Sequence, residues 1–394
     1  METPEHVLFH YRPMVCMGLG IVAGIFLSDS VSGTGFIAAL CLFSLFSGLG
    51  IYFGFRGAAL FALGCAAGLL RTLSGPVSLP YDLMYPFEHM RAVLSYACAS
   101  LFGKHAPLLN AMLWGVRGGV SDSVYDAFRS CGIAHILALS GLHVSFVTGA
   151  LNRLARRARP KMKFYISMAV LFTYCAVAAF PASLIRASVM SLCGLYAAAS
   201  GRRYDMPSGI AFSAIVILLT DPAALCGIGF QLSFGAVIMI SLLMRPVTDL
   251  LSFIPLPIAQ MIALSLCGTL GTLPLSVYYF GAIPVLGLFA NTLILPLVPF
   301  VFLSAMAVNL IGIAVPSAAR ALSFIPMFLT DVMTETANTV SSVSFAVKQA
   351  AITPLACLFV YLACFAVSDQ PLVSSSKKYA MCAASLFAAV LCML

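Results

Sequence analysis

The stretch 225–244, LCGIGFQLSFGAVIMISLLM, carries no charged side chain over its whole length. A helix needs about 20 consecutive apolar residues to cross the hydrocarbon core of a bilayer. Lipid offers the backbone no hydrogen-bond partners, so a spanning segment must satisfy its own N–H and C=O groups, as an α-helix does. A membrane β-barrel would instead show alternating apolar and polar residues along strands of about ten residues. This stretch therefore predicts a transmembrane α-helix and excludes a barrel.

The composition of the whole chain agrees with this stretch. The chain has 394 residues, of which 61% are hydrophobic and only 9% are charged, whereas a soluble domain has about 25% charged residues. This balance excludes soluble enzymes, disordered chains, secreted disulfide scaffolds and nucleic-acid-binding proteins that work outside a membrane. We predict an all-α polytopic integral membrane protein with about 11–13 transmembrane helices, some of them broken or re-entrant. The predicted spans lie near 14–28, 36–53, 58–70, 132–151, 164–180, 184–199, 208–220, 225–244, 258–280, 284–315, 350–367 and 379–394, with a weaker candidate at 322–345.

Positively charged residues predict the orientation of these spans, because cytoplasmic loops are enriched in Lys and Arg. The densest cluster, at 153–163, contains four arginines and two lysines and is predicted to be cytoplasmic. Counting crossings from this loop places the amino terminus inside and both the segment 72–131 and Asp221 outside. Lys377 and Lys378 also lie inside if the region 284–345 crosses the membrane twice, which is the least secure part of the count.

Small residues predict how some of the helices pack. Three pairs of glycines are spaced four residues apart, and such pairs let helix backbones approach closely in lipid. The 13 cysteines are scattered without a Cys-x-x-Cys pair, so most are predicted to be packing residues. A disulfide between Cys98 and Cys131 is left open, because both fall in the segment predicted to lie outside the membrane. The glycine pairs are Gly20 and Gly24, Gly50 and Gly54, and Gly64 and Gly68.

Prolines break the stretch 274–300 into short pieces. Irregular backbone at membrane depth is tolerated only where protein or a water-filled cavity covers it. The stretch is therefore a candidate for a pore lining or a re-entrant turn, and an ordinary pair of proline-kinked helices is an equally good interpretation.

Polar side chains inside the apolar segments are the candidate functional residues, because a charge at mid-membrane costs at least about 2.5–3.5 kcal/mol. Arg186 is the clearest case, and it either reaches the membrane interface along its aliphatic stem or lines an aqueous cavity. Any one such residue is commonly an interhelical hydrogen-bonding group, whereas several together favour a shared polar cavity. The full set is His135, Ser140, His143, Ser183, Arg186, Gln231 and Asn291.

Ser140 and His143 also suggest an intramembrane hydrolase, which would need a serine beside a base and an oxyanion hole. At 100° per residue the two side chains share a face of a helix. However, His143 is the last histidine of the chain, and the sequence contains neither His-Glu-x-x-His nor a phosphate-binding loop. We therefore expect no enzyme activity, no metal and no cofactor.

Several of these segments occur in one recognisable order. They are GIAHILALSGLHV at 132–144, SLIRA at 183–187, Asp221-Pro222, GFQLSF at 229–234, Leu273-Pro274, Phe280-Gly281, Asn291 and Pro296-Leu297. Together they cover roughly 105–315 and resemble the ComEC family of competence proteins. Each piece alone is weak, and the combination is specific.

The resemblance implies a channel of the bacterial inner membrane that imports single-stranded DNA in natural transformation. A strand with one phosphate charge per nucleotide needs a hydrated path with cationic or hydrogen-bonding groups. The seven polar residues above are suitable to line such a path, and Arg153, Arg156 and Arg157 to receive the strand at its cytoplasmic exit. The role of these arginines as the signal for orientation is the more plausible explanation of their position. The rival function is a small-solute or lipid-precursor transporter built on a similar polar core.

The chain departs from the longer members of that family. The segment 72–131 is too short for their OB-like domain, and no histidine follows residue 143 to build their metallo-β-lactamase-like domain. We therefore expect a separate nuclease, DNA receptor and motor to act with this chain. The predicted domains are a three-helix segment at 1–71, an extracytoplasmic or interfacial segment at 72–131, the channel domain at 132–367, and a cytoplasmic loop with the last helix at 368–394.

Overall fold

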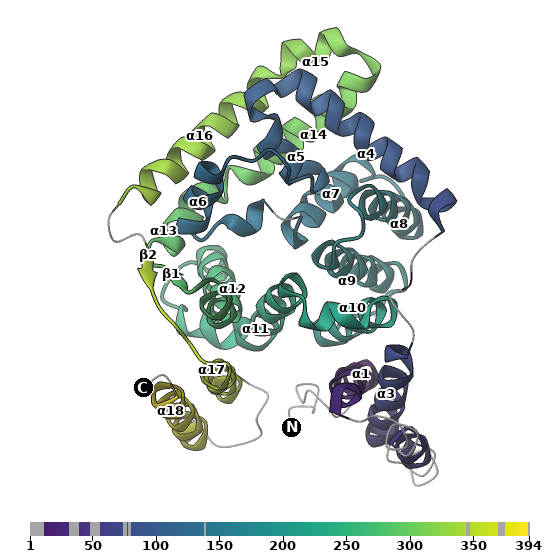
Figure 1. Ribbon diagram of the computed structural model, residues 1–394, viewed down its shortest axis with the longest axis vertical. Helices are drawn as coiled ribbons and strands as arrows, with labels where there is room; N and C mark the ends of the chain where they lie inside the picture. Colours follow the sequence, from purple (N-terminus) through teal and green to yellow (C-terminus); the bar gives the residue numbers. More distant parts are fainter. Residues whose placement is uncertain are drawn as a thin grey trace. The chain divides into compact units, whose positions relative to one another are not determined.

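A computed structural model of the protein describes residues 12–30, 39–47, 56–73, 77, 80–137, 139–343, 347–368 and 375–392. The described chain is helical almost throughout (Figure 1). Its residues pack into two compact units, each built from segments that are far apart in sequence. Unit 1 comprises 1–78, 203–281 and 351–394, and unit 2 comprises 79–202 and 282–350. The predicted domains follow chain order and stay predictions.

Three helices are long and apolar enough to cross a membrane: α9 (Ala182–Ala199), α11 (Ile228–Leu250) and α12 (Leu256–Phe280). Several shorter helices are also apolar, among them α10 (Met206–Thr220) and α14 (Val298–Ala314). The prediction of an all-α polytopic membrane protein is confirmed.

Unit 1 contains the first helix pair, and close backbone contact holds this pair together. A Cβ placed on Gly20 would meet the carbonyl oxygen of Phe61, and one placed on Gly68 would meet that of Ile21. The predicted packing role of the glycines is thus confirmed for Gly20, Gly24, Gly64 and Gly68. Gly50 and Gly54 lie outside the described residues, as do both ends of the span near 36–53, of which only 39–47 is described, as a helix. The elements of unit 1 are α1 (Pro13–Ser30), α3 (Arg56–Thr72), α10, a 3-10 turn at Pro222–Cys226, α11, α12, α17 (Pro354–Val367) and α18 (Ser375–Leu391).

Charged side chains tie α10 to the first helix pair at both of its ends. At its start, Asp205 accepts hydrogen bonds from the Arg12 Nε at 3.0 and 3.1 Å and from the backbone N–H of Ser208 at 3.0 Å. At its end, Arg71 donates to the carbonyl oxygens of Leu219 and Thr220, each at 2.6 Å. A cation at a helix C-terminus is favourable, because the last carbonyls carry partial negative charge.

Unit 2 has a continuous apolar core, in which large side chains such as Phe102, Phe128 and Phe302 are almost fully buried. Its one sheet among the described residues is a two-stranded antiparallel ladder that pairs Ala282 with Gln349. The elements of unit 2 are α4 (Tyr81–Phe102), a 3-10 turn at Gly103–His105, α5 (Ala106–Trp114), α6 (Asp122–Ser130), a 3-10 turn at Ala134–Ile136, α7 (Gly141–Leu154), α8 (Pro160–Val177), α9, β1 (Ala282–Pro284), α13 (Gly287–Ile294), α14, α15 (Pro316–Leu322), α16 (Phe324–Ser341) and β2 (Val347–Gln349).

Two predicted spans need correction. The span at 132–151 is wrong in its first half, because the chain forms a 3-10 turn there and α7 begins only at Gly141. The span at 284–315 is divided into β1, α13 and α14. The predicted break of 274–300 into short pieces begins after Gly281, whose left-handed φ of 65° ends α12, while Pro274 stays within that helix.

Cys98 and Cys131 are both buried free thiols, so the structure contains no disulfide between them. The Sγ of Cys98 lies 3.8 Å from the carbonyl oxygen of Ala106, and the Sγ of Cys131 donates to the carbonyl oxygen of Ala337 at 3.2 Å. Burial raises the pKa of Cys98 to about 12, which keeps its thiol protonated and unreactive.

Candidate functional site

Arg186 lies in the second turn of α9, and a tight turn places that helix. Ala179 and Phe180 both have left-handed backbone conformations, with φ of 61° and 51°. Residues other than glycine pay about 1–3 kcal/mol for such conformations, which persist only where the surroundings hold them. Phe180 is held by the hydrogen bond from its N–H to the carbonyl of Cys175, at 2.8 Å, before Pro181 starts α9.

Ser183 connects α9 to the chain that enters α7. Its hydroxyl donates to the carbonyl oxygen of Leu139 at 2.5 Å, across 44 positions of sequence. This bond satisfies a carbonyl next to the N-terminus of α7 and brings that N-terminus beside α9. Two segments of the predicted signature, 132–144 and 183–187, therefore meet in one place.

Ser140 and His143 form the N-terminal cap of α7. The backbone N–H of Ser140 donates to Nδ1 of His143 at 3.1 Å, and the Ser140 hydroxyl lies 3.2 Å from the same nitrogen. Because Nδ1 accepts a hydrogen bond in this arrangement, the neutral imidazole carries its proton on Nε2. The ring is fully buried and packs edge-on to Phe302, with ring centroids 4.9 Å apart. The pair thus stabilises the start of a helix, as a capping box does.

Arg186 is buried, with 6% of the residue exposed, and its guanidinium lies over the first residue of α7. A Cβ placed on Gly141 would come 3.3 Å from Nη2 of Arg186, so glycine leaves room for the arginine there. The N-terminus of a helix carries partial positive charge. A guanidinium beside it adds a second positive group, and the two together favour an anion such as a phosphate.

Other buried polar atoms of unit 2 add to the polarity of its interior. Asn291, in α13, has a buried Oδ1 without a hydrogen-bond partner, and so does Nε2 of His143. The indole of Trp114 and the hydroxyl of Tyr174 are also buried without a partner, and their rings contact edge to face with centroids 6.4 Å apart. An unpaired buried polar group costs about 1–3 kcal/mol, so these atoms favour contact with water or with a polar guest.

The structure brings together only part of the predicted set. Gln231 belongs to unit 1, where its amide binds α11 to its neighbours: Nε2 donates to the carbonyl of Leu225 at 3.1 Å, and Oε1 accepts from the hydroxyl of Tyr279 at 2.7 Å. His135 is exposed and its Nδ1 lies 3.2 Å from the carbonyl oxygen of Gly132. His135 and the other five residues lie in unit 2, and the contacts above join Ser140, His143, Ser183 and Arg186 around the start of α7.

Arginines 153, 156 and 157 are exposed at the other end of α7. Their position at a helix C-terminus is electrostatically favourable. Trp114, Tyr174 and Asn309 are not among the predicted site residues, although each is a polar group within an apolar segment, which is the signal that marked the others. Within the described ranges, no group of three His, Cys, Asp or Glu residues is placed to hold a metal ion.

The fold and the site define a polytopic helical membrane protein with a buried arginine and further polar groups inside it. A family model described as "Competence protein" matches residues 112–369, which is more than half of the chain. The chain belongs to this family, as its signature segments indicated.

Two relatives agree with this assignment. ComE operon protein 3 of Bacillus subtilis (strain 168) is 27% identical over 260 residues, which cover 65% of this chain and 32% of that protein. Competence protein ComA of Neisseria gonorrhoeae is 34% identical over 139 residues, which cover 33% of this chain and 20% of the relative. The matches thus span a third or less of the length of these relatives. No solved structure matches the chain.

Proposed function

We propose that this chain is a multi-pass channel of the bacterial cytoplasmic membrane that imports single-stranded DNA during natural transformation, with its amino terminus in the cytoplasm. Membership in the Competence family supports the process. The observation that carries the channel is the burial of Arg186 against the N-terminus of α7. The number of spans, about 11–13, is part of the same proposal.

The chemistry of a DNA strand fits this site. Each nucleotide carries one phosphate charge, and passage that tolerates every sequence favours contacts to the backbone over contacts to the bases. The planar guanidinium of Arg186 can donate two parallel hydrogen bonds to a phosphate. Within an apolar unit, such a contact gives the strand a binding position along the path. It also offsets part of the free-energy cost of burying the arginine.

The predicted lining residues divide into two roles in this proposal. Arg186 and Asn291 are the side chains whose polar groups face the strand. Ser140, His143 and Ser183 hold the backbone of unit 2 around the path through the hydrogen bonds described above, and Gln231 holds α11 within unit 1. His135, exposed at the turn before α7, belongs to the approach to the path.

We assign the chain no catalytic activity. His143 Nδ1 accepts a hydrogen bond from the backbone N–H of Ser140 at 3.1 Å, which occupies the lone pair that a catalytic base would use. The exposed arginines 153, 156 and 157 receive the emerging strand in this proposal, and a separate nuclease, DNA receptor and motor supply degradation, binding and force.

The experiment is a gene deletion complemented with variants, with transformation by purified DNA as the measurement. Wild type restores transformation, while Arg186→Gln lowers it about tenfold or more, because losing one charge-assisted contact of about 1.5–3 kcal/mol weakens binding by that factor or more. Arg186→Lys recovers part of the loss, since it keeps the charge without the planar fork. Arg202→Gln is the matched control, because Arg202 is an exposed arginine of the same unit.

All variants are compared at equal amounts of membrane-inserted protein. Normal transformation in the deletion strain would overturn the channel function. Normal transformation with Arg186→Gln would remove Arg186 from the path.

A further inference from the structure

The pairing of the two short strands of unit 2 limits how often the chain between them can cross the membrane. β1 and β2 pair antiparallel, with Ala282 opposite Gln349 and Ile283 opposite Lys348. The segment 285–346 therefore starts and ends at one place. Both of its ends lie on the same side of the membrane, so it crosses the membrane either twice or not at all.

Contacts of α14 bear on this choice. Asn309 is fully buried, and its Nδ2 donates to the carbonyl oxygen of Leu94 at 3.2 Å. Gly312 packs so closely on α4 that a Cβ there would come 2.6 Å from Cδ1 of Leu101. The C-terminal half of α14 thus lies along α4, in the segment that sequence analysis places outside.

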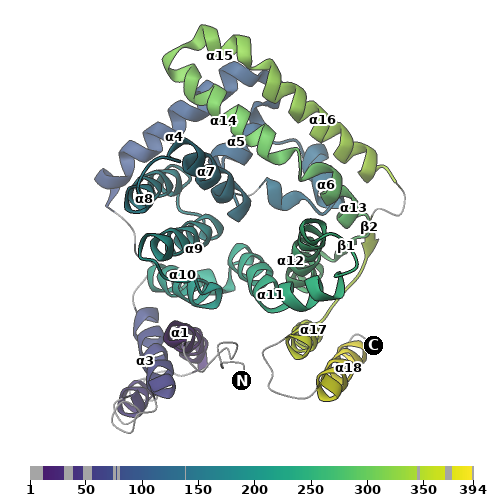
Figure 2. The ribbon, with the colours of Figure 1, turned by 180° about the vertical axis from the view of Figure 1, so that it is seen from behind.

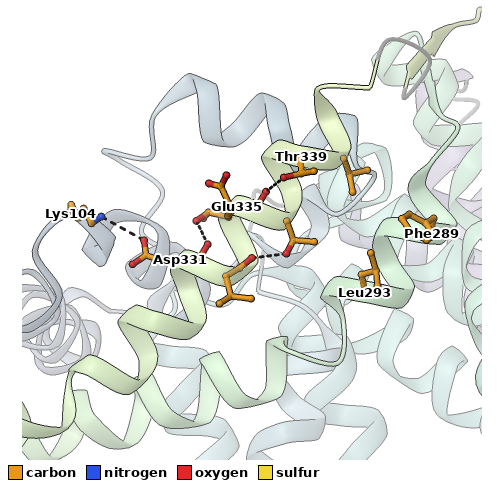
Figure 3. Close-up of a pocket in the computed structure, with 10 residues that line it drawn as sticks. Lys104, Phe289, Leu293, Asp331, Glu335 and Thr339 are labelled. Carbon is orange, nitrogen blue, oxygen red and sulfur yellow. Dashed lines mark hydrogen bonds and ion pairs between the residues drawn. The ribbon is translucent and has the colours of Figure 1, made fainter.

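Contacts of α16 lead to the same segment. Nε2 of His105 lies 2.8 Å from Oδ1 of Asp331. Nζ of Lys104 lies 3.6 Å from the same oxygen, and Figure 3 shows this ion pair. Farther along α16, the carbonyl of Ala337 accepts the thiol of Cys131 at 3.2 Å. The partners of α16 in all of these contacts therefore belong to the segment 80–131.

These contacts do not fit two crossings. If α14 spanned the membrane, its 17 residues would carry the chain about 25 Å, at 1.5 Å per residue, away from the side of β1. The end of α14 would then lie on the opposite side, whereas Gly312 lies against Leu101. From this we infer that the described residues 285–343 do not cross the membrane, and that α16 is anchored by its start, residues 324–328, in the outer lipid interface.

The exposed side chains of α16 change from apolar to polar along the helix. Its buried stripe repeats every three or four residues, as expected for one face packed on the protein. Near its start the exposed residues are Phe324, Ile325 and Phe328, with exposures of 62%, 39% and 65%. From Asp331 onward they are mostly polar and include Glu335 and Asn338. Residues 324–328 therefore fit the acyl-chain boundary, and the helix from Asp331 onward fits water.

Exposed residues near α16 include both apolar and polar side chains. The neighbouring helix α14 also exposes large apolar side chains, namely Phe300, Leu310 and Ile313. Toward water, Glu335 and Thr339 line an open groove with Lys104 and Asp331 (Figure 3). The lipid interface is therefore the occupant that suits Phe324 and Phe328, since amphipathic helices bind there through a buried apolar side.

The arrangement of unit 2 agrees with this assignment. In Figures 1 and 2, α4 and α16 run across the view and converge near α15, while α8 and α9 are seen nearly end-on. If α9 crosses the membrane, as its length and hydropathy allow, then α4 and α16 run along the membrane. A single exposed arginine, Arg320, would favour a cytoplasmic turn at α15, and the five contacts above outweigh it.

The first test is labelling with a membrane-impermeant thiol reagent in intact cells. Single cysteines replace Ser100, Ser317 and Asn338, all exposed, in a protein whose native cysteines have been substituted. We expect all three to be labelled from the same side. Labelling of Ser317→Cys from the side opposite to Ser100→Cys would show that α14 and α16 cross the membrane, and would overturn the inference.

The second test uses the single tryptophan of the chain, Trp114. In a Trp114→Phe background, Phe328→Trp should be quenched by lipids brominated on their acyl chains, and Asn338→Trp by aqueous iodide instead. Quenching of the Asn338→Trp fluorescence by bromines deep in the acyl chains would contradict the proposed anchor of α16. Absence of lipid quenching of the Phe328→Trp fluorescence would also contradict it. Both measurements report position only, so they remain informative even if DNA uptake proves not to be the function.

Discussion

Asp205 serves two structures of unit 1 at once, because its carboxylate caps α10 and binds Arg12. Replacing it with alanine removes both contributions, and we expect the unfolding free energy to fall by about 1–2 kcal/mol. Asn is also a good N-cap residue, so Asp205→Asn should lose only the ion pair, at less than about 1 kcal/mol, because the Asp205 side chain is 40% exposed and solvent screens the pair. Thermal unfolding in detergent at neutral pH measures the difference.

The pH dependence of Asp205 provides a second check on the same residue. Burial raises its pKa, but hydrogen bonds from Ser208 and Arg12 outweigh burial and hold the pKa below its usual value. A depressed carboxyl pKa stabilises the fold above the unfolded value of about 3.9 and loses that contribution as the pH falls through the folded value. The gap between wild type and Asp205→Asn should therefore close in acid. A gap that stays constant between pH 7 and pH 3 would exclude the ion pair as its source.

The Ser140 and His143 pair shows what residue types alone could predict. Both residues were recognisable in the sequence as polar groups in an apolar segment, and they were predicted to share one face of a helix that begins near residue 132. The helix begins at Gly141, so the two residues form its cap instead. The usual capping box has Glu or Gln three residues after the serine, and a histidine in that position gives no such signal. The bonds of Gln231 and Ser183 reach carbonyls that no local pattern identifies.

At the scale of helices, the close glycine contacts between α1 and α3 predict that alanine destabilises the protein at some of these glycines and not at others. Gly20→Ala places a Cβ against the carbonyl oxygen of Phe61, with Gly64 Cα only 3.0 Å away, and backbone cannot yield as a side chain can. We expect a loss of about 1–3 kcal/mol from overpacking. Gly57→Ala, in α3, is the control, because its Cβ would meet only Cys16 Sγ at an ordinary 3.6 Å. Thermal unfolding should separate the two variants, and equal melting temperatures would refute the close-contact account.

Helices were predictable where their physical cause is local. The spans at 184–199, 208–220 and 258–280 agree with α9, α10 and α12 to within two residues at each end, because continuous apolarity and end signals coincide there. The turn before α7 was not predicted, because the sequence at 132–140 is as hydrophobic as that of a membrane-spanning helix. The pairing of β1 with β2 joins two three-residue strands across more than sixty positions, and strands so short leave no periodic pattern.

At the scale of the molecule, side-chain contacts in unit 1 agree with the predicted sides of the membrane. Arg12 and Asp205 are both predicted to be cytoplasmic, and they form an ion pair with Nη2 and Oδ1 2.9 Å apart. Arg71 and Thr220 are both predicted to lie at the outer side, and they are joined by a 2.6 Å hydrogen bond. Helices α1 and α10 therefore start on the same side, although they are separated by most of the chain.

The orientation of the whole chain follows from the number of helices between two exposed residues. Arg157 is predicted to be cytoplasmic, and five helices, α8 to α12, separate it from β1, which pairs with the strand that holds Lys348. An odd number of crossings puts Arg157 and Lys348 on opposite sides. We expect an impermeant thiol reagent to label Lys348→Cys on intact cells, with Ser100→Cys as the reference, and Arg157→Cys only after the membrane is opened. Labelling of both from one side would mean that one of the five does not cross, and α8, which begins with Lys161 and Lys163 in its first turn, is the helix to test first.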